Sequence, residues 1–505
     1  MANISTAVGL ERKSRVSGYK IKKGVFNTNY ANLPQAIVIL GQANAANQAT
    51  LNTIKKEITS SQEAGETYGY GSPIHQIMRI LRPINSAGVG GIPTIVMPQA
   101  DADGATQTSV ELTVTGTATK NTTHTLVVNG RISVDFQNYS FTVNEGDTPT
   151  EIASKIADSI NGVLFSPVSA TSAAGVVTLT TKWKGATSSE INVSFDDYGD
   201  NAGITYAETN FTAGAGNVDL QSAFDQLGID WFTCVINPYI DKLGEIEQFN
   251  GVPFGVEPTG NYSPLVFKPF VSFFGSTESD KDDLALITDD NSRIEQVTNV
   301  LCPAPNSEGF PWEAAANVCR VFSRIAQDTP HLDVNNKDYP DMPVPASGLI
   351  GDMSDYNNRD FLVRKGCSTV TLEKSAYRIQ DLVTTYHPEG ENPLQFAYPR
   401  NLNLDWNIKD EYTILEKVNV RDHVLVDDDQ VTDAEKSVKP KQWQAVLVDF
   451  FDDLAVRALI REPRFSKDSL RVAISESNRD RFDTFFRYKR TGIARIESTD
   501  VEAGF

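Results

Sequence analysis

Composition changes abruptly at residue 103, and this change constrains the topology of the whole chain. Residues 103–212 contain no Cys and no Met, and threonine recurs throughout. Runs of alternating, β-branched residues follow one another, as at Glu111–Thr115, Tyr139–Val143 and Val176–Thr181, which favours strands with one solvated face. Helical and strand patterns alternate on both sides of this stretch. We therefore expect a compact β-rich domain, 103–212, inserted into an α/β domain made of residues 31–102 and 217–400.

One helix is predicted inside the β-rich stretch. Thr148-Pro-Thr-Glu151 has the pattern of a capping box with proline at the first helical position. Ile152, Ile156 and Ile160 then recur every fourth residue, which places them on one face of a helix.

The flanking α/β region shows short apolar strands and well-marked helix starts. Ser72 and Pro73 predict the N-cap and first turn of a helix. A second helix is expected from Pro311 to Ala326. The predicted strands are Gln35–Leu40, Pro93–Pro98, Trp231–Ile236, Val297–Cys302, Phe361–Val363, Ser368–Leu372 and Tyr377–Val383, and 327–360 is expected to be a long loop.

Both ends of the chain carry strand-like pieces with no neighbouring strand in the sequence. Residues 1–30 are polar and basic and predict an extended arm, in which Gly18–Gly24 alternates Tyr19 and Ile21 with lysines. Residues 401–505 predict a C-terminal domain with a helix from Gln442 to Ile460. It ends in strand-like Gly492–Glu497, which carries Ile493 and Ile496. A strand without its own partner is suited to pairing with the sheet of another subunit.

Charge is distributed unevenly along the chain. The formal net charge is −20, yet residues 1–32 and 457–495 are both net positive. An acidic body argues against a nucleic-acid binder, and basic ends on such a body favour subunit pairing. The predicted contact residues in the second basic segment are Arg479, Arg481, Arg487, Lys489 and Arg490.

The residue patterns that support catalysis or cofactor binding are missing from the sequence. It contains no Walker A loop, no HExxH and no GxSxG. The four cysteines, Cys234, Cys302, Cys319 and Cys367, lie far apart and predict neither disulfides nor zinc ligation. The start of the chain has no apolar export signal, and Ala36–Leu40 is only of strand length. We therefore expect no catalytic, cofactor or metal site, and no membrane insertion.

The order of several phrases resembles the Mu-like family of contractile phage tail sheath proteins. They are Gly24-Val-Phe-Asn-Thr-Asn, Pro34–Gly41, Tyr68–His75, Val143–Asp147, Ala174–Thr180 and Arg378–Tyr386. Together they extend over essentially the whole chain, and the β-rich insertion is similar to the one typical of the Mu-like branch.

This resemblance implies a fold, a function and a set of partners. It implies an inner α/β sheath core, an outer inserted domain, and N- and C-terminal arms that add strands to the sheets of neighbouring subunits. The chain would polymerise around a tail tube and contract without catalysis, and the basic segment would contact the tube or a neighbouring subunit. The implied partners are further copies of the chain, the tail tube protein, and the baseplate and tail terminator proteins. Assembly is expected in the host cytoplasm, and the final location is the virion.

Two alternatives stay open from the sequence. The same subunit design would serve a tailocin or another contractile injection system. A protein of a different class, a monomeric carbohydrate-binding protein or adhesin, would also account for the threonine-rich domain. An adhesin requires export, however, and the sequence shows no export signal.

Overall fold

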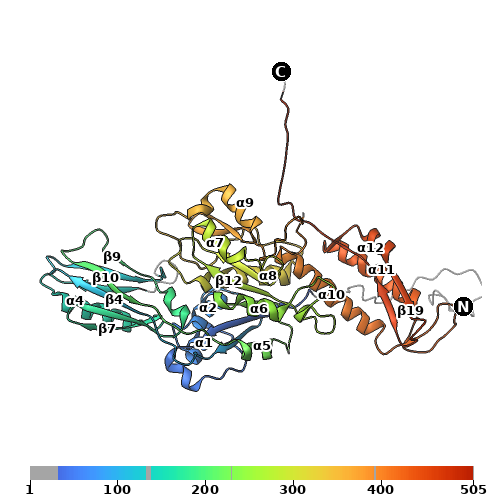
Figure 1. Cartoon of the computed structure of the whole chain (residues 1–505), viewed down its shortest axis with the longest axis horizontal. Helices are drawn as coiled ribbons and strands as arrows, with labels where there is room; N and C mark the ends of the chain where they lie inside the picture. The colour runs from blue at the N-terminus through green and yellow to red at the C-terminus, as the bar shows by residue number, and fades with distance from the viewer. Residues whose placement is uncertain (1–31, 132–137, 229, 392–393, 504–505) are drawn as a thin grey trace, which may run out of the picture. The chain divides into compact units, whose positions relative to one another are not determined.

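The computed structural model describes residues 32–131, 138–228, 230–391 and 394–503 (Figure 1). From Leu33 onward the chain forms one compact unit. Tyr19 and Ile21 of the expected N-terminal arm lie outside the described residues, as does the run Ile132–Phe136 in the insertion.

A six-stranded sheet forms the centre of the α/β region, in the order β13-β12-β11-β1-β3-β2. All neighbouring pairs are parallel except the short edge strand β2, which runs antiparallel to β3. The expectation of a mixed α/β fold is thus confirmed. The strands are β1 (Ile37–Gln42), β2 (Lys56–Glu57), β3 (Thr94–Gln99), β11 (Cys234–Ile236), β12 (Val271–Ser276) and β13 (Asn299–Pro303).

Helices cover both faces of this sheet because its strands are apolar on both sides. Ile37 and Ile39 belong to one buried cluster and Val38 and Leu40 to another, as expected for a parallel sheet buried on two faces. The helix predicted at Ser72 is confirmed, since the Ser72 side chain accepts the backbone N–H of His75. The helices of this region are α1 (Ser61–Tyr68), α2 (Pro73–Leu81), α5 (Gln221–Leu227), α6 (Leu243–Asn250), α7 (Lys281–Thr288) and α8 (Pro311–Asp328).

The insertion is built from two small antiparallel sheets and the predicted helix. One sheet has the order β10-β4-β8-β7 and the other β6-β5-β9. The capping box is confirmed, because Thr148 and Glu151 exchange side-chain and backbone hydrogen bonds at the start of α4 (Pro149–Asn161). The strands are β4 (Ser109–Thr115), β5 (Thr122–Val128), β6 (Tyr139–Val143), β7 (Val168–Ala173), β8 (Val176–Thr181), β9 (Val193–Asp196) and β10 (Thr205–Thr212).

A buried ion-pair network joins the insertion to the α/β core. Arg131, which follows β5, lies 3.2 Å from Glu313 at the start of α8 and 3.5 Å from Asp341. The side chains of Arg131 and Glu313 are only 4% and 1% exposed. Beside this network, the rings of Trp183 and Trp312 meet edge-on with centroids 6.0 Å apart. The insertion is therefore fastened by desolvated contacts.

One predicted strand is wrong. Phe361–Val363 lies within α9 (Tyr356–Arg364), whose first turn is capped by the side chain of Asp355. This cap outweighs the strand preference of the apolar triplet, and α9 begins inside the predicted 327–360 loop. After it, β14 (Thr369–Glu373) and β15 (Ala376–Asp381) pair as an antiparallel hairpin, close to the predicted strands.

The C-terminal region combines long helices with short strands. The helix predicted from Gln442 to Ile460 is confirmed as α11 (Pro440–Val456), which buries Trp443, Leu447, Phe450, Phe451 and Leu454. Its predicted end is wrong, because the helix stops at Val456 and Ile460 begins a short strand. A long helix before it, α10 (Pro399–Asn419), was not predicted. The remaining elements are β16 (Val424–Leu425), β17 (Ser437–Val438), β18 (Ile460–Arg461), α12 (Pro463–Ser469), β19 (Arg471–Ile474), β20 (Phe482–Phe485) and β21 (Lys489–Arg490). The division of the chain into an arm, a sheath domain, an insertion and a C-terminal domain stays a prediction.

Glu411 on α10 predicts a pH dependence of stability. Its carboxylate is fully buried, 2.6 Å from Arg457, and burial raises its pKa from 4.5 to about 7. Because the folded chain then binds this proton more tightly than the unfolded chain, this contribution is complete below pH 4.5 and is lost as pH rises through 7. Between about pH 5 and pH 8, the free energy of unfolding of the wild type should fall by roughly 1–3 kcal/mol more than that of Glu411→Gln.

Urea unfolding at the two pH values measures this difference. The exposed Glu435 provides the control, since Glu435→Gln should follow the wild type at both values. Parallel pH curves for the wild type and Glu411→Gln would show that Glu411 does not titrate in this range.

Candidate functional site: the root of the C-terminal arm

The last described residues leave the folded body as an extended segment. Residues 492–503, here called the C-terminal arm, pair with no strand in the described part of the chain. The predicted strand Gly492–Glu497 is therefore not formed within the subunit. Ile493 is half-buried, but from Ile496 onward the arm is exposed, with Ile496 at 90% and Val501 at 82%. Apolar side chains on an exposed extended backbone are suited to binding elsewhere.

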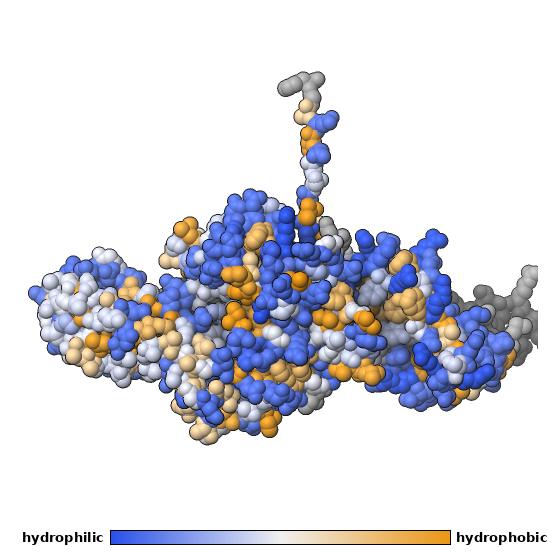
Figure 2. Space-filling view, viewed as in Figure 1, coloured by the Kyte–Doolittle hydropathy of each residue, from blue (hydrophilic) through white to orange (hydrophobic). Residues whose placement is uncertain are grey.

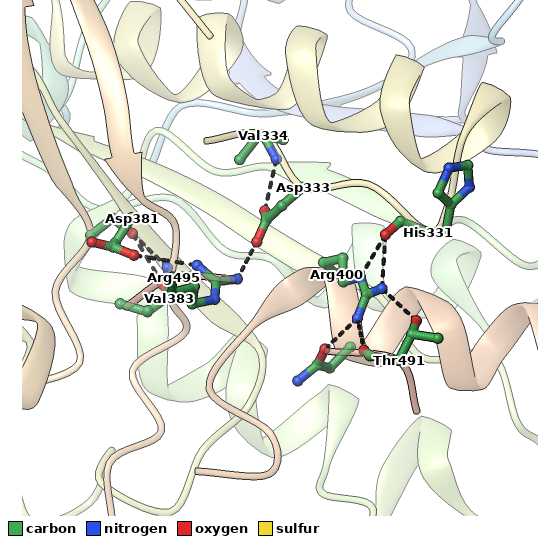
Figure 3. A network of polar contacts seen from close by, with 10 residues as sticks. His331, Asp333, Val334, Asp381, Val383, Arg400, Thr491 and Arg495 are labelled. Carbon is green, nitrogen blue, oxygen red and sulfur yellow. Dashed lines mark hydrogen bonds and ion pairs between the residues drawn. The ribbon is translucent and has the colours of Figure 1, made fainter. Parts of the chain in front are cut away.

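Arg495 anchors the arm to the body. Its guanidinium forms an ion pair with Asp333, lies 3.3 Å from Asp381, and stacks 3.7 Å above the ring of Tyr398 (Figure 3). The Arg495 and Asp333 side chains are only 17% and 7% exposed. Burial raises the pKa of Asp381, and Arg495 offsets part of that rise. Arg495 is thus the last residue of the arm held by buried charge contacts.

Arg400, on the first turn of α10, provides a second anchor. Its Nη2 atom donates to the carbonyl of His331 and to Oγ1 of Thr491, each at 2.8 Å (Figure 3). Burial lowers the pKa of Arg400 to about 10, which leaves it charged at neutral pH. Thr491 immediately precedes the arm, so Arg400 and Arg495 fix both ends of the arm root.

Leu33, at the start of the folded body, and the root of the arm are attached to the same helix. The backbone N–H of Leu33 donates to Oδ1 of Asn407 at 2.8 Å, and Asp405 holds Arg490 through a 2.7 Å hydrogen bond. Arg400, Asp405 and Asn407 all lie in the first three turns of α10. A displacement of α10 would therefore move Leu33 and the arm root together.

The structure separates the five basic residues predicted as contacts. Arg490 is committed to Asp405, and Lys489 lies 2.5 Å from Glu462. Arg481 pairs with Asp483 at 2.7 Å on the exposed β20 side of the hairpin. In the described part of the chain, no carboxylate lies within ion-pair distance of Arg479 or Arg487. These two exposed arginines are the members most available for a partner.

Two arginines near α12 were not among the predicted contact residues, and the fold brings them close to Arg487, which was. Arg464 on α12 is 93% exposed, and Arg471 at the start of β19 is also exposed. The backbone N–H of Arg487 donates to Oγ of Ser469 at 2.8 Å, which brings Arg487 beside the end of α12. We call Arg464, Arg471 and Arg487 the α12 basic surface. Its members are up to 23 residues apart, so only the fold brings them together.

The β19–β20 hairpin has unpaired edges. It is a two-stranded antiparallel sheet in which Arg471 faces Phe485, and no third strand joins it among the described residues. Trp443 of α11 supports it by donating from Nε1 to Oγ1 of Thr484 at 3.1 Å. Such a hairpin can accept a further strand through main-chain hydrogen bonds.

Other kinds of site find little support in the described residues. They contain no group of three or more His, Cys, Asp or Glu side chains that could hold a metal ion. All four cysteines are buried and unbridged. No helix in the described ranges is both long and apolar enough to cross a membrane.

The fold and the site thus define a multidomain α/β protein with a β-rich insertion, an anchored extended arm and an open-edged hairpin. No family model matches the sequence. The chain is 28% identical over 213 residues to the Mu-like prophage FluMu tail sheath protein of Haemophilus influenzae. The match includes 39% of this chain and spans 42% of that relative's length. The resemblance to Mu-like tail sheath proteins is confirmed over this region.

Solved structures with a similar chain course were also found. The sheath tail protein of Desulfitobacterium hafniense has a TM-score of 0.42 and 13% identity, with 94% of this chain and all of that one covered. A chain of the anti-feeding prophage baseplate has a TM-score of 0.47 and 9% identity, over 98% of this chain and all of that one. A chain of the contracted sheath complex of the extracellular contractile injection system PVC has a TM-score of 0.42 and 9% identity, over 97% and 98%.

Proposed function

We propose that this chain is the structural subunit of a contractile tail sheath. It polymerises as a helical sheath around a tail tube and contracts to drive the tube through the host envelope. The observation that carries the proposal is the C-terminal arm, which is anchored at Arg495 and then exposes an unpaired, partly apolar backbone. The similarity to a tail sheath protein supports the same conclusion.

Subunits are linked by strand addition. The arm of one subunit supplies backbone donors, acceptors and apolar side chains, and the β19–β20 hairpin of another supplies free edges. The basic N-terminal segment with Tyr19 and Ile21 serves as a second linking strand. Because main-chain hydrogen bonds depend little on side-chain identity, such links persist while subunits rotate as rigid bodies. The work of contraction then comes from the lattice, and the subunit needs no enzymatic activity.

The basic hairpin region contacts the acidic tube or a neighbouring subunit. Of the five predicted residues, Arg479 and Arg481 are exposed at the turn of the hairpin, where Arg481 pairs with Asp483, and Arg487 is exposed after β20. Lys489 and Arg490 are engaged within the subunit. The further partners of the sheath are the baseplate and tail terminator proteins, and the assembled location is the virion or a related injection particle.

Reversing the charges of the hairpin turn tests the tube contact. Arg479→Glu together with Arg481→Glu should reduce co-sedimentation with tube protein about tenfold at low salt, because repulsion replaces attraction. Thermal unfolding should be unchanged, since both side chains are exposed. Lys374→Glu with Lys436→Glu, an equal change of charge at two exposed positions outside the hairpin, is the control. Undiminished co-sedimentation of the double variant would remove the tube contact from this turn.

Electron microscopy of the purified full-length protein at rising concentration tests the proposed function itself. Striated hollow tubes, formed alone or on added tube protein, are the expected result. Monodisperse particles in both conditions would contradict a sheath function and favour a protein that acts as a monomer.

A further inference from the structure

An open cleft of about 1200 Å³ lies at the root of the C-terminal arm. Its walls come from the segment after α7, from α9, and from residues 387–391 and Leu394, and Arg495 and Ile496 of the arm also line it. Tyr356, which is 61% exposed, and Leu394 add apolar surface. Figure 2 shows hydrophilic residues predominating on the visible face where the arm leaves the body.

The cleft has an excess of negative charge. Three of its carboxylates are neutralised within the subunit: Asp289 by Lys365, Asp360 by Arg364, and Asp381 by Arg495. Glu295, Glu389 and Glu391 have no basic partner within ion-pair distance in the described part of the chain.

These three carboxylates are available to a partner of opposite charge. Glu295 and Glu389 are exposed, and Glu391 accepts the hydroxyl of Tyr386 at 2.6 Å. Burial, helped by Glu391 and Glu295, raises the pKa of Tyr386. Arg495 and Ile496 of the arm line the cleft, but the acidic residues beyond them, Glu497, Asp500 and Glu502, are repelled from this surface, so the cleft does not suit the outer part of the subunit's own arm.

A surface of matching positive charge lies on the hairpin region. The α12 basic surface presents Arg464, Arg471 and Arg487. Among the described residues, the carboxylate within ion-pair distance of these three is that of Asp468, 3.7 Å from Arg464 and itself 73% exposed. Arg471 is the first residue of β19 and Arg487 follows β20 by two positions. The basic surface is therefore part of the same unit of structure as the hairpin edges.

The length of the arm limits how far the acidic cleft of one subunit can lie from the basic surface of the subunit that receives the arm. This step rests on the proposed function, in which the arm of one subunit pairs with the hairpin of the next. The exposed residues 496–503 span at most about 29 Å when extended. Since Ile496 lines the cleft, a hairpin that receives this arm must lie within that distance of the cleft.

We propose that the acidic cleft of one subunit binds the α12 basic surface of a second copy. Glu295, Glu389 and Glu391 face Arg464, Arg471 and Arg487 across this contact. Exposed ion pairs are individually weak and are screened by salt, so the contact can break and re-form while the arm stays paired. The sheath lattice then combines a permanent link through the arm with a releasable electrostatic contact beside it.

Reciprocal charge reversal tests the contact. Glu295→Lys with Glu389→Lys, or Arg464→Glu with Arg487→Glu, should each raise the critical concentration for assembly about tenfold at low salt, with unchanged thermal unfolding. Combining all four substitutions in one chain should restore assembly to within about threefold of the wild type, because the attraction is re-created with reversed sign. Asp429→Lys with Asp433→Lys, and Lys374→Glu with Lys436→Glu, make matching changes at exposed positions and serve as controls.

The outcomes separate this contact from the proposed function. Tubes that form at wild-type concentrations in both reversed variants would overturn the contact while leaving the sheath function intact. Equal defects in the four-fold variant and the single-surface variants would also overturn it. If no variant forms tubes, sedimentation velocity at low salt decides. If the wild type self-associates, the single-surface variants do not, and the four-fold variant does so again, the contact between subunits is supported although no sheath forms. If the wild type itself does not self-associate, the contact is overturned.

Discussion

A chain that ends at Arg495 should remain a folded monomer and lose the ability to form tubes. The described residues beyond Arg495 are exposed, so their removal should change the free energy of unfolding by less than about 0.5 kcal/mol. Assembly would lose a whole added strand, with its main-chain hydrogen bonds and the side chains of Ile496 and Val501. We expect the critical concentration to rise at least about 100-fold, measured by pelleting and electron microscopy alongside thermal unfolding.

Point variants distinguish the arm's apolar side chains from its length. Ile496→Asp with Val501→Asp keeps the arm intact but places charge where apolar side chains would be buried, so it should approach the truncation in effect. Ser498→Asp with Thr499→Asp adds the same charge at the polar positions of the arm and should have a smaller effect. Wild-type tubes from the truncated chain would show that the arm does not link subunits.

Helices whose start is determined by residues within one turn could be predicted from the sequence. The capping box of α4 and the Ser72-Pro73 start of α2 depend on residues within one turn, and both formed as expected. The helix α10 was missed for a physical reason. Its buried face carries Arg400, Asn403, Asn407 and Glu411 at helical spacing, so a polar stripe occupies the position of the usual apolar one.

Of the candidate site, the arm could be predicted from the sequence, but the residues that anchor it could not. The arm was visible in the sequence because it is an alternating segment without a partner. Its anchors were not, because Asp333, Asp381 and Arg400 lie roughly 90 to 160 residues before the residues they hold. Helical spacing of buried-type polar residues from Pro399 onward is the signal that could have identified the anchor helix. The partners of each residue, however, are determined by the fold.

The buried network around Arg131 should dominate the stability of the joint between the insertion and the core. Arg131→Met would leave Glu313 buried without its cation, 3.2 Å away in the wild type. Burial already raises the pKa of Glu313, and Arg131 offsets part of that rise. Breaking a buried pair by removing one partner costs about 3–5 kcal/mol, and urea unfolding should show a loss of this size. Arg378→Met, which breaks partly exposed pairs with Asp338 and Glu373, should cost about 1 kcal/mol or less.

Two further measurements test whether the unpaired carboxylate of Glu313 causes the loss of stability in Arg131→Met. Without Arg131 the folded-state pKa of Glu313 rises further, so the deficit of Arg131→Met should shrink as pH falls and the carboxylate is protonated. Arg131→Met with Glu313→Gln should recover part of the lost stability, because the uncompensated charge is gone. A deficit independent of pH and unrelieved by Glu313→Gln would mean that Arg131 acts through packing alone. If the prediction holds, the insertion is held to the core by charge, and it moves with the core as one body whenever the subunit rotates.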